Sequence, residues 1–133
     1  MATAEQRTHA KNFLKKAEEY LASAESNYTA DRLTPAAGDA IHAGISSKDA
    51  VLISVTGSTG KGKDHATAAK ELKQAMGKRP EATTLERALR ELLSAKSDVE
   101  YGFELISATK AESLLRRART MVEVAAQIVK LGR

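Results

Sequence analysis

Hydrophobic residues in this chain recur mostly three or four positions apart, the spacing that places them on one face of an α-helix. Thr3 and Gln6 form the T-x-x-Q pattern of a capping box just before the first such run. We therefore predict a helix over about 4–27, with an apolar face made of Ala10, Phe13, Leu14, Ala17, Leu21 and Ala24.

The second predicted helix covers about 35–56, with Thr34 as its N-cap and Pro35 at its first position. Its apolar face is unusually rich in small residues, among them Gly38 and Gly44. Glycine in a helix costs about 0.5–1 kcal/mol relative to alanine, so we expect close packing against another helix or a bend here.

Three further helices are predicted in the second half of the chain. A short one begins at Asp64 or His65 and ends at Gly77. The next two follow the capping-box patterns Thr83–Glu86 and Thr109–Glu112. The fourth helix has a heptad-like apolar row that consists of Leu85, Leu89, Leu92, Val99 and Phe103, and Gly102 should end or bend it.

The fold class expected from these patterns is all-α, an antiparallel bundle of four to five helices. Only 4% of the residues are aromatic, and the two prolines leave long stretches without a helix breaker. A chain of 133 residues is the size of one domain, so we predict a single helical-bundle domain over 1–133. The glycine-rich loop at about 57–63, with the short helix after it, is expected to cross one end of the bundle.

Several classes of protein are excluded or disfavoured by what the sequence lacks. It has no cysteine, which rules out disulfides, thiol catalysis and cysteine-based zinc sites. It has no apolar run of about 18 residues, and its first residues lack the apolar core of a signal peptide. We therefore expect a cytoplasmic protein without a membrane segment.

The excess positive charge is concentrated in one segment. The net charge is +4; residues 57–80 contain six basic and two acidic residues, and the rest of the chain has 15 of each. A local basic patch such as this, which includes Lys61 and Lys63 of the loop, favours polyanions through counterion release. The alternative interpretation is a solvated surface without a specific ligand.

Cofactor and metal motifs are weak. The loop sequence GSTGKGK is not a phosphate-binding loop, because Val55 stands where that motif needs its first glycine and Gly62 follows the lysine. Asp39 and His42 share a helix face, but a metal would need further ligands from other helices, such as Glu18 or Glu19. We expect neither a cofactor nor a metal, and we expect His42 to lie at the edge of the core with one hydrogen bond.

Lys96 is the most informative single residue, because it stands in the apolar row of the fourth helix. Glu100, four residues later, can pair with it on the same helix face. One interpretation is that the lysine side chain extends past the apolar row into solvent. The other is a polar site between helices that faces a cleft or a dimer partner.

The run Lys96-Ser-Asp-Val-Glu-Tyr-Gly102 resembles the last conserved stretch of HEPN domains, often R-x-x-A-D-Y-G. Phe13-Leu14 with Ala17 and Leu21 is similar to the first helix of that family, F-L-x-x-A-x-x-x-L. Asp39-Ala-Ile-His42-Ala, followed by Ala50-Val-Leu52, is similar to the second, A-x-x-H-A and A-L-L. The resemblance covers roughly residues 8–129 and is closest to the small stand-alone HEPN proteins of actinobacteria.

The resemblance implies an all-α bundle, often a homodimer packed through the motif helices. Many HEPN members cleave RNA without a metal, with an R-x(4–6)-H motif whose arginine binds phosphate and whose histidine lies near the scissile ribose. Here these positions are Lys96 and Tyr101. Lysine lacks the bidentate fork of arginine, and a tyrosine hydroxyl, with an ordinary pKa of about 10, is a poor general base at neutral pH. Catalysis is therefore not expected.

Three functions remain open at this stage. The first is a non-catalytic module that binds nucleic acid or nucleotide, with a site made of Lys96, Glu100, Tyr101, His42, Lys61 and Lys63. The second is a subunit with a purely structural or interaction role, bound to a protein partner in a toxin–antitoxin or phage-defence setting, as the resemblance implies. The third is a weak metal-independent ribonuclease that uses Lys96 and Tyr101.

Overall fold

The structure, a computed structural model, describes residues 3–59 and 65–131. These ranges contain five helices: α1 (Ala4–Thr29), α2 (Leu33–Thr56), α3 (His65–Met76), α4 (Ala82–Tyr101) and α5 (Ala108–Lys130). The expected all-α class is confirmed. Lys61 and Lys63 lie outside the described residues. None of the described helices combines the length and the apolar character needed to cross a bilayer.

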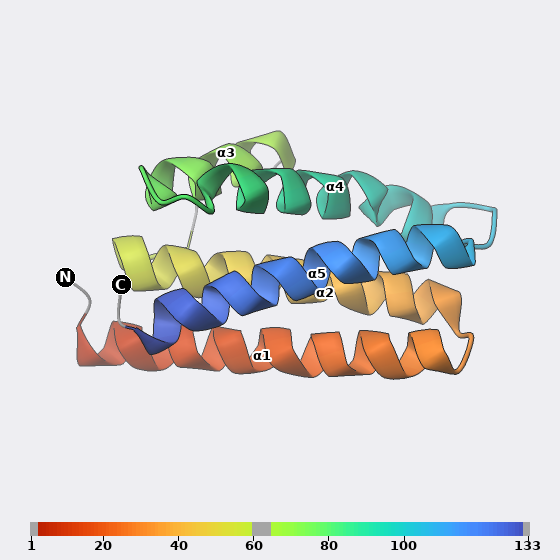
Figure 1. Cartoon of the computed structure of the whole chain (residues 1–133), viewed down its shortest axis with the longest axis horizontal. Helices are drawn as coiled ribbons and strands as arrows, with labels where there is room; N and C mark the ends of the chain where they lie inside the picture. The colour runs from red at the N-terminus through yellow and green to blue at the C-terminus, as the bar shows by residue number, and fades with distance from the viewer. Residues whose placement is uncertain (1–2, 60–64, 132–133) are drawn as a thin grey trace.

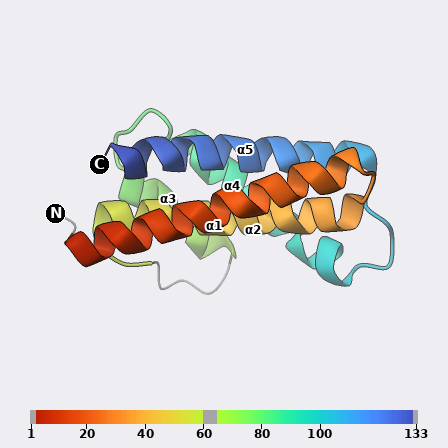
Figure 2. The ribbon, with the colours of Figure 1, turned by 90° about the horizontal axis from the view of Figure 1, so that it is seen from below.

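The helices are arranged in three layers (Figure 1), with α1 on one side, α2 and α5 in the middle, and α3 and α4 on the other side. The long helices run antiparallel to their neighbours in sequence, so α1 begins and α5 ends at the same end of the bundle (Figure 2). Helix α3 packs mainly against α4. The prediction that this segment crosses one end of the bundle is therefore wrong for the described helix.

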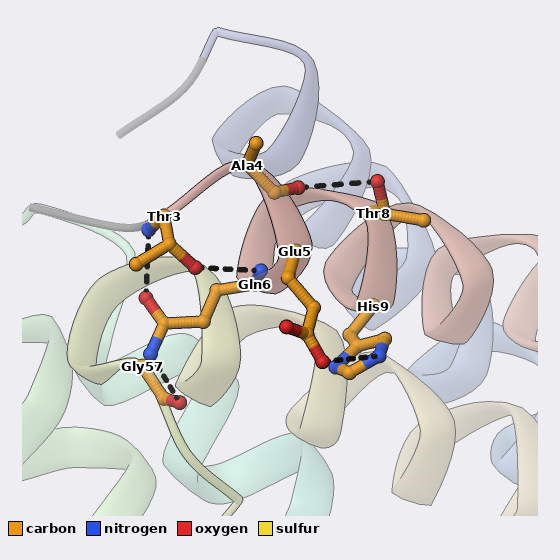
Figure 3. Close-up of polar contacts among 7 residues, drawn as sticks. All are labelled: Thr3, Ala4, Glu5, Gln6, Thr8, His9 and Gly57. Atoms are coloured by element: carbon orange, nitrogen blue, oxygen red, sulfur yellow. Dashed lines mark hydrogen bonds and ion pairs between the residues drawn. The ribbon is translucent and has the colours of Figure 1, made fainter.

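The capping box predicted at the start of α1 is confirmed. The backbone N–H of Gln6 donates to Thr3 Oγ1 at 3.0 Å, and the backbone N–H of Thr3 donates to Gln6 Oε1 at 2.8 Å (Figure 3). The same Gln6 side chain donates through Nε2 to the carbonyl of Gly57 at 3.1 Å. Gly57 ends α2 with a φ of +88°, a left-handed conformation that suits glycine. One side chain thus joins the start of α1 to the end of α2.

The start of α3 at His65 agrees with its prediction, while the predicted starts of α2, α4 and α5 are each wrong by two residues. Helix α2 begins at Leu33 after N-cap Arg32, which places Pro35 in the first turn, where its missing N–H costs no helical hydrogen bond. Helix α4 begins at Ala82, because a turn in which Ala82 N–H donates to the Arg79 carbonyl starts the helix before Thr83.

At the start of α5, Ser107 is the N-cap in place of Thr109, and its hydroxyl accepts from the Lys110 backbone N–H at 3.1 Å. The end of α3 agrees with its prediction. Gly77 follows Met76 with a φ of +58°.

The apolar row predicted for α4 is shorter than expected. Leu85, Leu89, Leu92 and Val99 are buried, but Phe103 lies beyond the end of the helix and is fully exposed. Gly102 ends α4 in an extended conformation, and its backbone N–H donates to the carbonyl of Asp98. The chain then leaves the bundle before α5 begins. Phe103 is therefore no part of the core.

Helix α2 is the centre of the bundle. Twelve of its 24 residues are buried, against four of 26 in α1, because α2 packs against all four other helices. The close packing expected from its small residues is confirmed at Gly44, where an added Cβ atom would lie 2.5 Å from Leu92 Cδ1 of α4 and 3.4 Å from Met121 Sδ of α5. At Gly38 the nearest atom, Val99 Cγ1, is 3.9 Å away, which is ordinary van der Waals contact.

The two helical glycines should therefore respond in opposite ways to alanine. Gly44→Ala places a methyl group against the fully buried Leu92, and we expect a net loss of about 1–2 kcal/mol in the free energy of unfolding. Gly38→Ala, the matched control, should gain about 0.5–1 kcal/mol from helix propensity. Urea denaturation of both variants measures this. Equal effects of the two substitutions would contradict the packing described for Gly44.

Candidate functional site

The expected pair between Lys96 and Glu100 forms on the last two turns of α4. Lys96 Nζ lies 2.9 Å from Glu100 Oε2, and the two side chains are 30% and 25% exposed. Lys96 is therefore neither buried nor fully solvated. Its stem follows the edge of the apolar row while its ammonium reaches a carboxylate at the surface. An ammonium has three N–H donors, so two remain for a ligand.

The pair changes the proton affinity of both partners. The hydrogen bond from Lys96 holds the pKa of the Glu100 carboxyl below its usual range, helped by the charges of Lys96 and His42 and by Tyr101. The same hydrogen bond to Glu100 raises the pKa of Lys96. Both groups are accordingly held in their charged forms at neutral pH.

His42 of α2 connects this pair to α1. Its Nε2 atom lies 4.0 Å from Glu100 Oε1, and its ring stacks on Tyr20 of α1 with centroids 5.2 Å apart and an interplanar angle of 29°. Within the described parts of the chain no hydrogen bond reaches the imidazole, so the expected single hydrogen bond is wrong. An aromatic ring and a carboxylate hold His42 instead, with its side chain 43% exposed.

Tyr101 and the residues after it form an exposed apolar corner between α4 and α5. Tyr101 is 78% exposed, Phe103 is fully exposed and Leu105 is 91% exposed. A cavity of about 430 Å³ lies beside them, with Asp98 and Glu104 at its border. Tyr101 therefore adjoins the Lys96–Glu100 pair on one side and an apolar patch on the other.

The described part of the basic segment does not join this site. Lys73 of α3 lies 3.8 Å from Glu86, near the start of α4. Glu86 and Lys96 are ten residues apart on the same helix, which is about 15 Å along its axis. The predicted site residues that come together are thus Lys96, Glu100, Tyr101 and His42, while Lys61 and Lys63 lie outside the described residues.

Sequence reasoning missed the contribution of α1. Tyr20 stacks on His42, and Ser23 and Asn27 both donate to Asp39 Oδ2 of α2, at 2.6 and 3.1 Å. The available signal was that Tyr20 lies seven residues after Phe13, which places both aromatic rings on one side of the helix. In the regions the structure describes, no group of three histidine or acidic side chains is arranged to hold a metal ion.

Comparison with known protein families matches residues 10–129 to the HEPN domain, which covers most of the chain. The resemblance found in the sequence motifs is thereby confirmed. No curated protein matches the chain.

Removing one partner of the ion pair should give a pH-dependent change in stability. A lowered pKa at Glu100 stabilises the fold above the ordinary value of 4.5, and this contribution is lost as the pH falls through the lowered value. A raised pKa at Lys96 stabilises below the ordinary value of 10.5 and is lost as the pH rises through the raised value. Between the two ordinary pKa values of 4.5 and 10.5, Glu100→Gln should therefore lower the Tm. At pH values below the lowered pKa of Glu100, the substitution should have little effect.

Thermal melts at several pH values measure this difference. Glu112→Gln is the matched control, because no ion pair to this exposed α5 residue is present in the described ranges. A Tm difference for Glu100→Gln that does not shrink in acid would show that the ion pair is not its cause.

Proposed function

Because this chain belongs to the HEPN domain family, we propose that it is a helical module that binds single-stranded nucleic acid or nucleotides without cleaving them. The proposal is supported by a row of contacting surface side chains, Lys96, Glu100 and His42, with the exposed ring of Tyr101 beside it. Together they offer a cation, Lys96, that can bind a phosphate and an aromatic ring, Tyr101, on which a base can stack.

Lys96 is the phosphate-binding residue of the proposal. Glu100 accepts one of its hydrogen bonds and fixes the position of the ammonium, and the other donors face outward on a partly exposed side chain. A phosphate that approaches Lys96 also meets the negative charge of Glu100. Binding at this position is therefore expected to be weak, sensitive to salt, and stronger when the Glu100 charge is removed.

Tyr101 supplies the stacking surface. Its side chain is mostly exposed at the end of α4, five residues after Lys96, and every nucleobase has a flat face that can stack on such a ring. Base–aromatic stacking contributes about 1–3 kcal/mol per base and tolerates different sequences. Single-stranded RNA is the ligand class that fits this combination best, because its bases are unpaired and can stack on an aromatic side chain.

Cleavage is not part of the proposal. In the HEPN ribonuclease motif these positions hold arginine and histidine, and here they hold Lys96 and Tyr101. His42, the histidine nearest to Lys96, reaches the site from α2 and is held by Tyr20 and Glu100. A weak ribonuclease remains the competing function, and the binding experiment below tests it in the same samples.

A second copy of the chain is the proposed partner for the exposed corner. Phe103 and Leu105, which follow the Tyr101 ring that is left free for a base, are largely exposed and form an apolar patch without cover from the described residues. Two copies that pack these side chains against each other would remove both from water, which favours association.

Charge substitutions at the ion pair should change RNA affinity in opposite directions. Lys96→Met should weaken binding of a labelled single-stranded RNA and reduce the salt slope by about 0.7, while Glu100→Gln should strengthen binding. Fluorescence anisotropy at low and moderate salt measures both. Lys130→Met, at the opposite end of the bundle, is the matched control. Because both substitutions break the same ion pair, weaker binding in both variants would indicate a structural effect and contradict the proposal.

Stacking on Tyr101 should depend on the ring and not on the hydroxyl. Tyr101→Ala should weaken RNA binding by about 5- to 150-fold, and Tyr101→Phe should leave it nearly unchanged. A denaturing gel of the same samples should show intact RNA after hours of incubation. If the wild-type protein cleaves the RNA and Lys96→Met abolishes this cleavage, the protein is a ribonuclease and the proposal of a non-catalytic binding module is wrong.

The apolar patch should control the oligomeric state. We expect light scattering after size exclusion to give about twice the 14.3 kDa mass of one chain. The double variant Phe103→Ser and Leu105→Ser should be monomeric. Leu131→Ser, which changes an exposed leucine at the other end of the bundle, should leave the dimer intact. A monomeric wild type, or a double variant that still dimerises, would contradict this part of the proposal.

A further inference from the structure

A second polar site lies between α1 and α2, in a cavity of about 490 Å³. Its lining consists of Lys16, Glu19, Tyr20 and Ser23 of α1 and Asp39 of α2. It combines an aromatic ring with two carboxylates, a hydroxyl group and one ammonium. Tyr20 is the residue that this site shares with the Lys96 region, because its ring also stacks on His42.

The carboxylate of Asp39 is held in place before any ligand arrives. Ser23 Oγ and Asn27 Nδ2 both donate to Oδ2, at 2.6 and 3.1 Å, and Arg32 Nε donates to Asn27 Oδ1 at 2.8 Å. Within residues 3–59 and 65–131, no hydrogen bond reaches the other oxygen, Oδ1. A carboxylate oxygen offers two lone-pair positions, so Oδ1 can accept a donor from a ligand in the cavity.

The charges favour a cationic ligand. The lining contains the carboxylates of Glu19 and Asp39 and the ammonium of Lys16, and Lys15 lies 3.9 Å from Glu19, so Asp39 is the carboxylate left for a ligand. The ammonium of Lys16 also lies 5.3 Å from the centroid of Phe13, one turn earlier on α1, in a cation–π contact. A phosphate in this cavity would meet two carboxylates, so a nucleotide is disfavoured here. A cation gains from the Asp39 carboxylate and from the Tyr20 ring.

The shape of the lining favours a flat cation. A guanidinium can lie on the Tyr20 ring while its N–H groups point at Asp39 Oδ1, a geometry that an ammonium does not match. We propose that the α1–α2 cavity binds an arginine side chain presented by a protein partner, with Tyr20 as the stacking surface and Asp39 as the fixed acceptor. This proposal does not rest on the nucleic-acid binding proposed at Lys96, although Tyr20 also stacks on His42 of that region.

The test uses the full chain and two small probes, N-acetyl-arginine methylamide and its uncharged isostere N-acetyl-citrulline methylamide. Backbone amide shifts in a ¹⁵N-labelled sample report binding and its position. The arginine probe should shift the amides around Tyr20 and Asp39 in a saturable way at roughly millimolar concentration, and the citrulline probe should bind about tenfold more weakly or not at all.

Substitutions then assign the roles. Asp39→Asn should lower the affinity for the arginine probe by about tenfold or more. Tyr20→Phe keeps the aromatic ring and should retain binding, whereas Tyr20→Leu should lose most of it. Glu112→Gln, a surface carboxylate outside the cavity, is the matched control. Probe comparison on the wild-type chain needs no variant, so the proposal stays testable if Asp39→Asn does not fold.

Three results would overturn the proposal: no saturable shift with the arginine probe, equal binding of the two probes, or a mononucleotide that shifts the Tyr20 and Asp39 amides while the arginine probe does not. Failure of this test leaves the Lys96 proposal in place, because that proposal is measured with RNA and with different variants.

Discussion

Close packing around α2 is the constraint on which the rest of the structure depends. At Gly44 the backbone of α2 comes so near to Leu92 and Met121 that a Cβ atom could be added only if the buried Leu92 side chain moved. Alanine and serine dominate the other buried positions of the helix, and they let all four remaining helices approach it. A helix with large side chains at these positions would force the layers apart, because interiors are packed without room for extra atoms.

The candidate site follows from this central position. Helices α1 and α4 lie in different layers and do not pack against each other. His42 of α2 is exposed between them, and it contacts Tyr20 on one side and approaches Glu100 on the other. Through His42 of α2, the polar surface therefore connects α1 with α4, which do not contact each other directly. Electrostatically, Lys96 and Glu100 neutralise each other in the free protein, so a ligand must compete with an existing partner.

Much of the fold was predictable because helical periodicity is a local property. The burial of Leu14, Leu89 and Leu115 follows from spacing alone, and so does the Lys96–Glu100 pair, whose partners are four residues apart on one helix. Helix starts were harder, since the turn at Arg79–Ala82 and not the Thr83 side chain decides where α4 begins. Sequence spacing places Tyr20 on the same side of α1 as Phe13, but it does not tell which residue of another helix Tyr20 contacts, so the stacking on His42 was not predictable.

The most direct test of the central claim is to map RNA binding on the protein itself. Amide shifts of ¹⁵N-labelled protein, titrated with a short single-stranded RNA, report which residues the ligand meets. The account predicts the largest changes at the end of α4, from Lys96 to Tyr101, with smaller changes at His42 of α2. Changes confined to the basic residues of α3 and the α3–α4 turn, with none near Lys96, would contradict it.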